Sequence, residues 1–258
     1  MAHPTATATS AAPAPELRAY YDALFAAFGP QHWWPSSKSG GPFEIIVGAI
    51  LTQSTAWTNV EKAIVNLRRA RVLTPRAIER IPIARLARLI RPSGYFHQKA
   101  KKLKAFVRFL RDEHGGSLAR MFRTPTAELR EQLLAVHGIG PETADSIMLY
   151  AGSHPVFVVD AYTRRILFRH ALIAEKPTRS LPGSTYEEIR ALFESALPHD
   201  AQLFNEFHAL LVHTGKYFCR PRDPRCDSCP LRAFLPLVAH VPVGRVSGRI
   251  DVRLPASK

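Results

Sequence analysis

The sequence predicts an all-α fold, and three observations support this prediction. Apolar residues recur at helical spacing along most of the chain, alternating strand patterns are nearly absent, and turns rich in glycine and proline separate the striped segments. The 258 residues are enough for one large domain or two small ones, each with a real core.

The helical stripes lie between two segments without clear periodicity. Residues 1–16 are mainly alanine, threonine and proline, which indicates a disordered tail, and residues 236–258 form a C-terminal tail. Thr124 and Pro125 are typical of an N-cap followed by proline at the first helical position. In chain order, the helical stripes fall on residues 16–28, 43–50, 58–71, 91–116, 125–136, 141–151, 160 onward, 184–196 and 200–216.

The chain is strongly basic. Its formal net charge is +14 and its isoelectric point is about 10.2. A field of this sign favours polyanions, so we expect a nucleic-acid partner; a merely basic soluble protein is the alternative. No apolar run approaches the roughly 20 residues of a membrane helix, and the first residues lack signal and transit patterns. These features predict a cytoplasmic, nucleoid-associated protein without membrane contact.

Three cysteines lie close together near the C-terminus. Cys219, Cys226 and Cys229 fall within eleven residues, and the rest of the chain has none. An odd, clustered set is unlike a secreted disulfide framework. It indicates a metal or cluster loop in a reducing compartment.

The stretch HGIGP, residues 137–141, predicts a helix–hairpin–helix. Gly138 and Gly140 permit backbone conformations closed to other residues and let a phosphate approach the amides. The following helix presents free N–H groups and the positive end of its dipole, and Pro141 suits its first position. Ile139 can fill the space between the two helices. We expect these residues to bind a DNA phosphate; an ordinary turn is the alternative.

LLAVHGIGPETADSIMLYAGSHPVFVVDAYTRRIL resembles the signature of the endonuclease III superfamily of DNA glycosylases. GAILTQSTAWTNVEKAI resembles the early helix pair of that family, and RPSGYFHQKAKKL resembles its second hairpin-like segment. The resemblance covers roughly residues 17–235. It implies a six-helix barrel, residues 41–154, facing a helical domain built from residues 17–40 and 155–235. It also implies a monomer that binds double-stranded DNA in the groove between them.

The resemblance identifies Asp160 as the catalytic aspartate. A base inside a duplex must be flipped out before its N-glycosidic bond can be broken. A carboxylate beside the sugar can then stabilise the positive charge and activate a water molecule. In isolation, an aspartate at a helix start is more often an N-cap, and both roles can coexist.

Glu142 departs from the family members that also cut the strand. Those members carry a lysine two residues after the second glycine, and its amine forms a Schiff base with the sugar. Glu142 occupies that position, so we expect a monofunctional glycosylase, with Glu142 either contacting base or water or simply favouring the helix dipole. The alternatives are a bifunctional enzyme acting on oxidised pyrimidines and a non-catalytic DNA-binding protein.

The resemblance also implies contacts to DNA and to the flipped base. Gln53 matches a region that fills the gap left by the flipped base, although a surface glutamine is the simpler reading. Trp33 and Trp34 can stack on a cationic base or can pack between domains. With Glu142 and the RPSG segment, this Trp-Trp-Pro run resembles the alkylpurine glycosylases. The lysines expected to contact DNA are Lys99, Lys101 and Lys102.

The cysteine loop matches the position where family members carry an iron–sulfur cluster. Cys219, Cys226 and Cys229 have the expected spacing, but Leu235 occupies the place of the usual fourth cysteine. A [4Fe–4S] cluster normally needs four thiolates. A cluster with a different fourth ligand, zinc with a histidine such as His240, and no metal all remain open. The arginines expected to face phosphates around this loop are Arg220, Arg222, Arg225 and Arg232.

Overall fold

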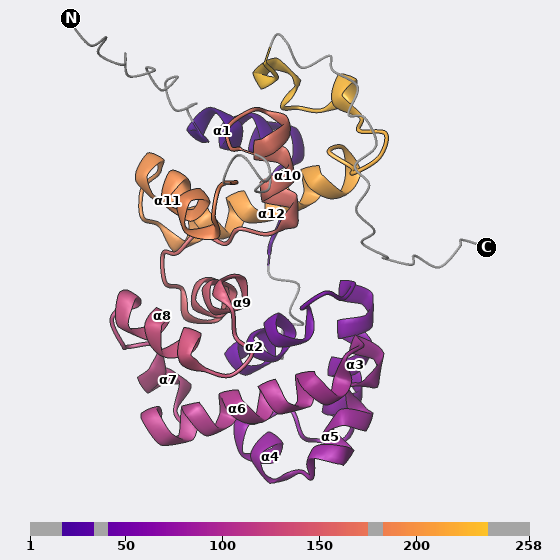
Figure 1. Ribbon diagram of the computed structural model, residues 1–258, viewed down its shortest axis with the longest axis vertical. Coiled ribbons are helices and arrows are strands. Elements are labelled where there is room, and N and C mark those ends of the chain that lie inside the picture. The colour runs from indigo at the N-terminus through magenta and orange to yellow at the C-terminus, as the bar shows by residue number, and fades with distance from the viewer. Residues whose placement is uncertain (1–16, 34–40, 175–182, 237–258) are drawn as a thin grey trace, which may run out of the picture.

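The computed structural model describes residues 17–33, 41–174 and 183–236, and this part of the chain is helical without β-strands (Figure 1). The all-α prediction is therefore confirmed. The two predicted tails, residues 1–16 and 236–258, lie outside the described residues except for residue 236. None of the described helices has the length and apolar character needed to cross a membrane.

Twelve α-helices and four short helical turns make up the described residues. The α-helices are α1 (Leu17–Phe28), α2 (Gly41–Leu51), α3 (Trp57–Arg69), α4 (Pro75–Arg80), α5 (Ile83–Leu89), α6 (Phe96–His114), α7 (Leu118–Met121), α8 (Thr126–Ala135), α9 (Pro141–Ser146), α10 (Ala161–Arg169), α11 (Tyr186–Ala196) and α12 (Ala201–Tyr217). The turns are the 3₁₀ segments η1 (Arg91–Ser93), η3 (Cys226–Ser228) and η4 (Arg232–Phe234), and the π-helical segment η2 (Ile147–Ala151).

Most predicted helices are present, with two differences. Helices α4, α5 and α7 were not expected, because seven residues or fewer are too short to show a clear stripe. Pro125 rather than Thr124 is the N-cap of α8, because its extended backbone (φ −52°, ψ 143°) delays the helix to Thr126. Proline also lacks a side chain that can cap the first turn.

The helices form two groups (Figure 1). Helix α1 packs on α12, and α10 also packs on α12, so the start of the described chain lies beside its later part. Helices α2 to α9 form the other group, in which α2 contacts α3, α6, α9 and η2. The boundaries predicted at residues 41 and 155 stay a prediction.

A largely buried segment without helical structure, residues 155–159, connects the two groups. Phe157 stacks on Phe193 of α11, with ring centroids 3.7 Å apart, and meets the edges of Phe204 and Phe207 of α12. This aromatic contact fixes the end of the segment from which α10 begins. Asp160 is therefore presented from a rigid support.

Candidate active site

The predicted hairpin connects α8 to α9. Gly138 has φ +81°, a left-handed conformation that favours glycine, and a Cβ there would lie 2.5 Å from Cγ of Lys102. A Cβ on Gly140, the N-cap of α9, would meet no atom within 4 Å. The side chain of Ile139 is buried, as predicted. One glycine is thus required by the fold, and the other leaves open space before the helix.

Gln53 and Lys102 hold the hairpin from outside. Gln53 Nε2 donates to the carbonyl oxygen of Gly138 at 3.0 Å and to Oγ1 of Thr143 at 2.9 Å. Lys102 Nζ donates in turn to Gln53 Oε1. Three parts of the predicted DNA contact, the hairpin, Gln53 and Lys102, therefore lie together in the structure. That Gln53 fills the gap left by a flipped base stays a prediction.

The expectation that Lys99 contacts DNA is wrong. Its residue surface is 2% exposed, and its Nζ donates to Leu51 O at 2.9 Å, Thr55 Oγ1 at 2.7 Å and Ser93 O at 2.6 Å. Burial and the neighbouring charge of Lys102 lower the pKa of Lys99 to about 8. All three donors are used inside the protein, so Lys99 cannot reach a phosphate. Lys101 is exposed, and its contact with DNA stays a prediction.

Asp160 is the N-cap of α10. Its Oδ1 accepts from the backbone N–H of Thr163 at 2.8 Å. Its Oδ2 lies 3.7 Å from Nε2 of His208, and its side chain keeps 14% of its surface exposed. One oxygen thus fixes the side chain, while the carboxylate remains accessible.

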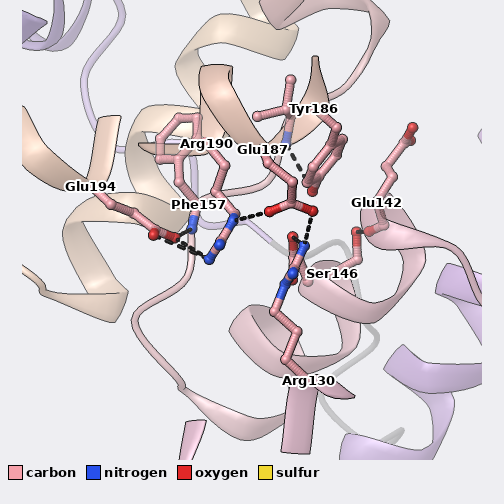
Figure 2. A network of polar contacts seen from close by, with 10 residues as sticks. Arg130, Glu142, Ser146, Phe157, Tyr186, Glu187, Arg190 and Glu194 are labelled. Atoms are coloured by element: carbon pink, nitrogen blue, oxygen red, sulfur yellow. Dashed lines mark hydrogen bonds and ion pairs between the residues drawn. The ribbon is translucent and has the colours of Figure 1, made fainter. Parts of the chain in front are cut away.

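Glu142 lies in the first turn of α9 and interacts electrostatically with Asp160. It is exposed to solvent, yet the protein atoms around its carboxyl partly desolvate it. This desolvation and the charge of Asp160, opposed by Arg164, raise the pKa of Glu142 to about 7. Figure 2 shows its side chain extending away from the Arg130–Glu187 ion pair. The structure therefore presents two carboxyl groups that interact, and Glu142 is the one whose pKa is raised.

His208 and Tyr150 belong to the same site but were not predicted. The hydroxyl of Tyr150 lies 2.6 Å from Nδ1 of His208, whose side chain is 6% exposed. Burial lowers the pKa of His208, and the charge of Asp160 opposes this. Tyr150 lies within the segment that resembles the family signature, but nothing in that pattern marks it as a site residue, and His208 lies on an apolar helical stripe outside the quoted motifs.

Trp33 approaches this site, and Trp34 lies outside the described residues. The ring of Trp33 is 6.4 Å from that of His208 in an edge-on arrangement. The side chain of Trp33 also lies close enough to the Tyr150 hydroxyl for the two to interact electrostatically. Trp33 thus lies beside His208, and stacking on a base stays a prediction.

A polar network connects the two helix groups next to the site (Figure 2). Arg130 of α8 bonds to Asp145 of α9 at 2.7 Å and to Glu187 of α11 at 2.8 Å. Arg190 bonds to Glu187 and to Glu194, both at 3.1 Å. The network thereby joins α8 and α9 to α11.

The same network holds the backbone that leads to Asp160. The N–H of Phe157 donates to Oε1 of Glu194 at 2.9 Å, and the N–H of Val159 donates to the hydroxyl of Tyr186 at 3.4 Å (Figure 2). Tyr186 also bonds to Asp145. These contacts satisfy backbone donors that have no partner in a helix or sheet.

The three cysteines border one small cavity of about 10 Å³ together with Leu235. Arg169 Nη1 lies 3.1 Å from Sγ of Cys219. Within the described ranges, no three histidine, cysteine or acidic side chains are arranged to hold a metal ion. His240 lies outside these ranges. The thiols are neighbours, but the loop as it stands encloses space for about one water molecule.

Comparison with known proteins gives a consistent result. Residues 47–198 match the model of the HhH-GPD superfamily base excision DNA repair proteins. A protein of Methanocaldococcus jannaschii provisionally named a DNA repair glycosylase is 42% identical over 216 residues, which cover 83% of this chain and 93% of that protein. Endonuclease III of Thermotoga maritima is 28% identical over 195 residues, covering 76% of this chain and 83% of its own length.

Two solved structures are similar to the chain. The 3-methyladenine DNA glycosylase of H. pylori bound to 1,N6-ethenoadenine aligns with a TM-score of 0.61 and 29% identity, covering 77% of this chain and 96% of that one. An endonuclease III–DNA complex aligns with a TM-score of 0.71 and 22% identity, covering 87% and 96% of the two chains. The second likeness, at this identity, concerns the fold alone.

Proposed function

Because the chain belongs to the HhH-GPD superfamily of base-excision DNA repair proteins, we propose that it is a monofunctional DNA glycosylase. It flips a damaged base out of duplex DNA, hydrolyses the N-glycosidic bond and leaves an abasic site. The observation that carries this proposal is the Asp160 carboxylate, which is fixed by a helix cap, remains accessible and lies beside Glu142.

The reaction assigned to Asp160 is a hydrolysis. The bond between C1′ of the sugar and the base nitrogen breaks, its electron pair leaves with the base, and positive charge develops on the sugar. The carboxylate stabilises that charge, and a water oxygen forms the new bond to C1′. The water gives up a proton to Asp160. A cationic alkylated base leaves as the neutral purine, whereas a base that is neutral in the DNA takes up a proton from solvent.

The monofunctional assignment rests on Glu142. A carboxyl group cannot form the Schiff base through which strand cleavage proceeds, and this position faces Asp160 closely enough for the two charges to interact. Lys99 cannot replace the missing amine, because its Nζ is buried and bonded to three oxygens. Water is therefore the nucleophile.

Alkylated purines are the proposed substrates. The support is the 29% identity to a 3-methyladenine DNA glycosylase and the position of Trp33 beside the site. A cationic alkylated base is already a good leaving group, and an indole face attracts it. The groove for duplex DNA would lie between the two helix groups, with the hairpin on a phosphate and a single chain per lesion.

End-labelled duplexes with single lesions test this function. The panel contains 3-methyladenine, 7-methylguanine, 1,N6-ethenoadenine, thymine glycol and an undamaged control. We expect cleavage at an alkylated purine only after alkali treatment. Cleavage without alkali, together with trapping by borohydride, would identify a lyase. Binding without base release on every duplex would identify a non-catalytic protein.

We propose that the cysteine loop holds a [4Fe–4S] cluster through Cys219, Cys226 and Cys229 and a fourth ligand other than Leu235. The three thiols border one cavity, and Arg169 adds positive charge beside them. The loop must open around such a group, and the cluster would serve to hold the loop. Iron and acid-labile sulfide in anaerobically purified protein, lost in Cys226→Ser, are the expected result; bound zinc or no metal would contradict it.

A further inference from the structure

His208 of α12 links the predicted base pocket to Asp160. Its ring meets the ring of Trp33 edge-on, contacts the hydroxyl of Tyr150 in η2 and faces Asp160, the N-cap of α10. The four side chains come from four separate parts of the sequence. Their meeting at one place is a property of the fold alone.

The surroundings of His208 determine which ring nitrogen carries the proton. An unprotonated Nε2 would direct its lone pair at Oδ2 of Asp160, 3.7 Å away, and a lone pair and a carboxylate oxygen repel each other. The proton therefore belongs on Nε2, and Nδ1 accepts from the hydroxyl of Tyr150 at 2.6 Å.

Nε2 of His208 is buried and makes no hydrogen bond within the described part of the chain. A buried donor without a partner is rare and calls for a functional explanation. Oδ2 of Asp160, at 3.7 Å, is less than 1 Å beyond hydrogen-bond distance from it. Contacts of this kind in free enzymes commonly shorten when substrate binds.

We propose that His208 is a positioning residue for base excision. Its Nε2–H donates to Oδ2 of Asp160 in the substrate complex, while the N–H of Thr163 holds Oδ1. The two donors orient the carboxylate toward the sugar. Tyr150 fixes the tautomer of His208, and a base seated against Trp33 is thereby coupled to the group that drives its release. This inference rests on the proposed glycosylase function.

Two amide substitutions separate positioning from packing. The amide of His208→Gln reaches the position of Nε2 and can still donate to Asp160, whereas that of His208→Asn reaches only the position of Nδ1. The quantity to measure is the single-turnover rate constant for base excision, on the lesion duplex from which the wild type releases the base fastest. We expect His208→Asn to lower the rate constant by about 10- to 100-fold, as loss of an outer hydrogen-bond partner usually does. His208→Gln should stay within about threefold of the wild type.

A binding measurement and two further variants complete the test. The dissociation constant for a duplex with a tetrahydrofuran abasic analogue should be unchanged in both variants, because His208 does not reach DNA. His213→Asn on the same helix is the matched control and should excise as the wild type does. Tyr150→Phe removes only the hydroxyl, so it tests the contacts of His208 in a second way and should also slow excision.

The results that would contradict this inference differ from those that would contradict the proposed glycosylase function. His208→Asn acting at the wild-type rate, or Gln and Asn variants slowed equally, would show that His208 only packs. Unimpaired excision by Tyr150→Phe would contradict the assigned tautomer. A folded wild-type chain that releases no base from any duplex would instead contradict the proposed function and this inference with it.

Discussion

The two oxygens of the Asp160 carboxylate have different surroundings, so the capping role and the proposed catalytic role of the side chain can be tested separately. Oδ1 accepts the capping hydrogen bond from Thr163, while Oδ2 faces His208 and stays close to solvent. Asparagine caps a helix about as well as aspartate does but carries no charge. A single substitution can therefore remove the charge and keep the fold.

Asp160→Asn should lower the single-turnover rate of base release by at least about 100-fold, because it removes the charge that stabilises the developing cation. Its urea midpoint and its affinity for the lesion duplex should remain close to those of the wild type. Asp200→Asn is the matched control, since Asp200 caps α12 in the same way, at 2.7 Å to the N–H of Leu203. Base release at the wild-type rate by Asp160→Asn would remove the basis of the proposed mechanism.

The raised pKa of Glu142 predicts how stability depends on pH. A carboxyl group with a pKa near 7 in the folded state and near 4.5 in the unfolded state binds protons better when folded. Its stabilising contribution is present below pH 4.5 and is lost as the pH rises through 7. The side chain introduced by Glu142→Gln cannot ionise. The melting temperature of this variant minus that of the wild type should therefore increase from pH 5 to pH 8.

Melting curves at both pH values provide the measurement. The control is Glu128→Gln in the first turn of α8. An equal pH dependence of the melting temperature in wild type and Glu142→Gln would show that this carboxyl group is not perturbed.

Substitutions of two lysines in α6, Lys99 and Lys101, should affect different properties, namely stability and DNA binding. Lys99→Met should reduce the free energy of unfolding by about 1–3 kcal/mol, because it leaves Leu51 O without its buried donor. Lys101→Met, at an exposed position two residues away, should leave stability unchanged and weaken DNA binding. Urea denaturation and a salt titration of binding measure the two effects. The reverse pattern would contradict the roles assigned to the pair.

At the scale of elements, the hairpin between α8 and α9 uses its two glycines differently. Gly138 needs its positive φ and the space taken by Lys102, while Gly140 is open to solvent. The fold therefore depends on Gly138, whereas access for a phosphate depends on Gly140.

Gly138→Ala should lower the free energy of unfolding by about 1–2 kcal/mol through strain alone. Gly140→Ala should leave unfolding nearly unchanged but weaken binding to duplex DNA, because its methyl group occupies the space that a phosphate would enter. Urea denaturation and fluorescence anisotropy with a labelled duplex separate the two. Full DNA affinity in Gly140→Ala would mean that the hairpin does not contact the phosphate.

The sequence revealed those elements whose signals are local. The hairpin, the buried Ile139 and the helix start at Asp160 each follow from a few neighbouring residues. Lys99 was misassigned because a net charge does not say which face of α6 turns inward. His208 and Tyr150 were missed because their chemistry arises only where α12, η2 and α10 meet.

At the scale of the whole molecule, the two helix groups are joined by an ion network around a fully buried acid. Asp145 is held by Arg130 and Tyr186, and Arg130 continues to Glu187 on α11. Burial raises the pKa of Asp145 and Arg130 opposes this, so the arginine keeps a charge in place that would otherwise be costly.

Arg130→Met should reduce the free energy of unfolding by about 3–5 kcal/mol, because it leaves Asp145 buried without its cationic partner. Arg18→Met is the control, since Arg18 forms an exposed pair with Asp22 worth about 0.3–0.5 kcal/mol. Urea denaturation gives both values. A loss below 1 kcal/mol in Arg130→Met would show that the network does not hold the two helix groups together.

The packing of α1 on α12 has a consequence for synthesis on the ribosome. Gln31, just after α1, meets His213, 182 residues further along the chain. At about 5–20 residues per second, the first helix waits roughly 10 to 40 seconds for the helix that covers it. Nascent chains halted before α12 emerges would therefore display α1 uncovered, with Tyr20 and Leu24 in reach of chaperones and proteases.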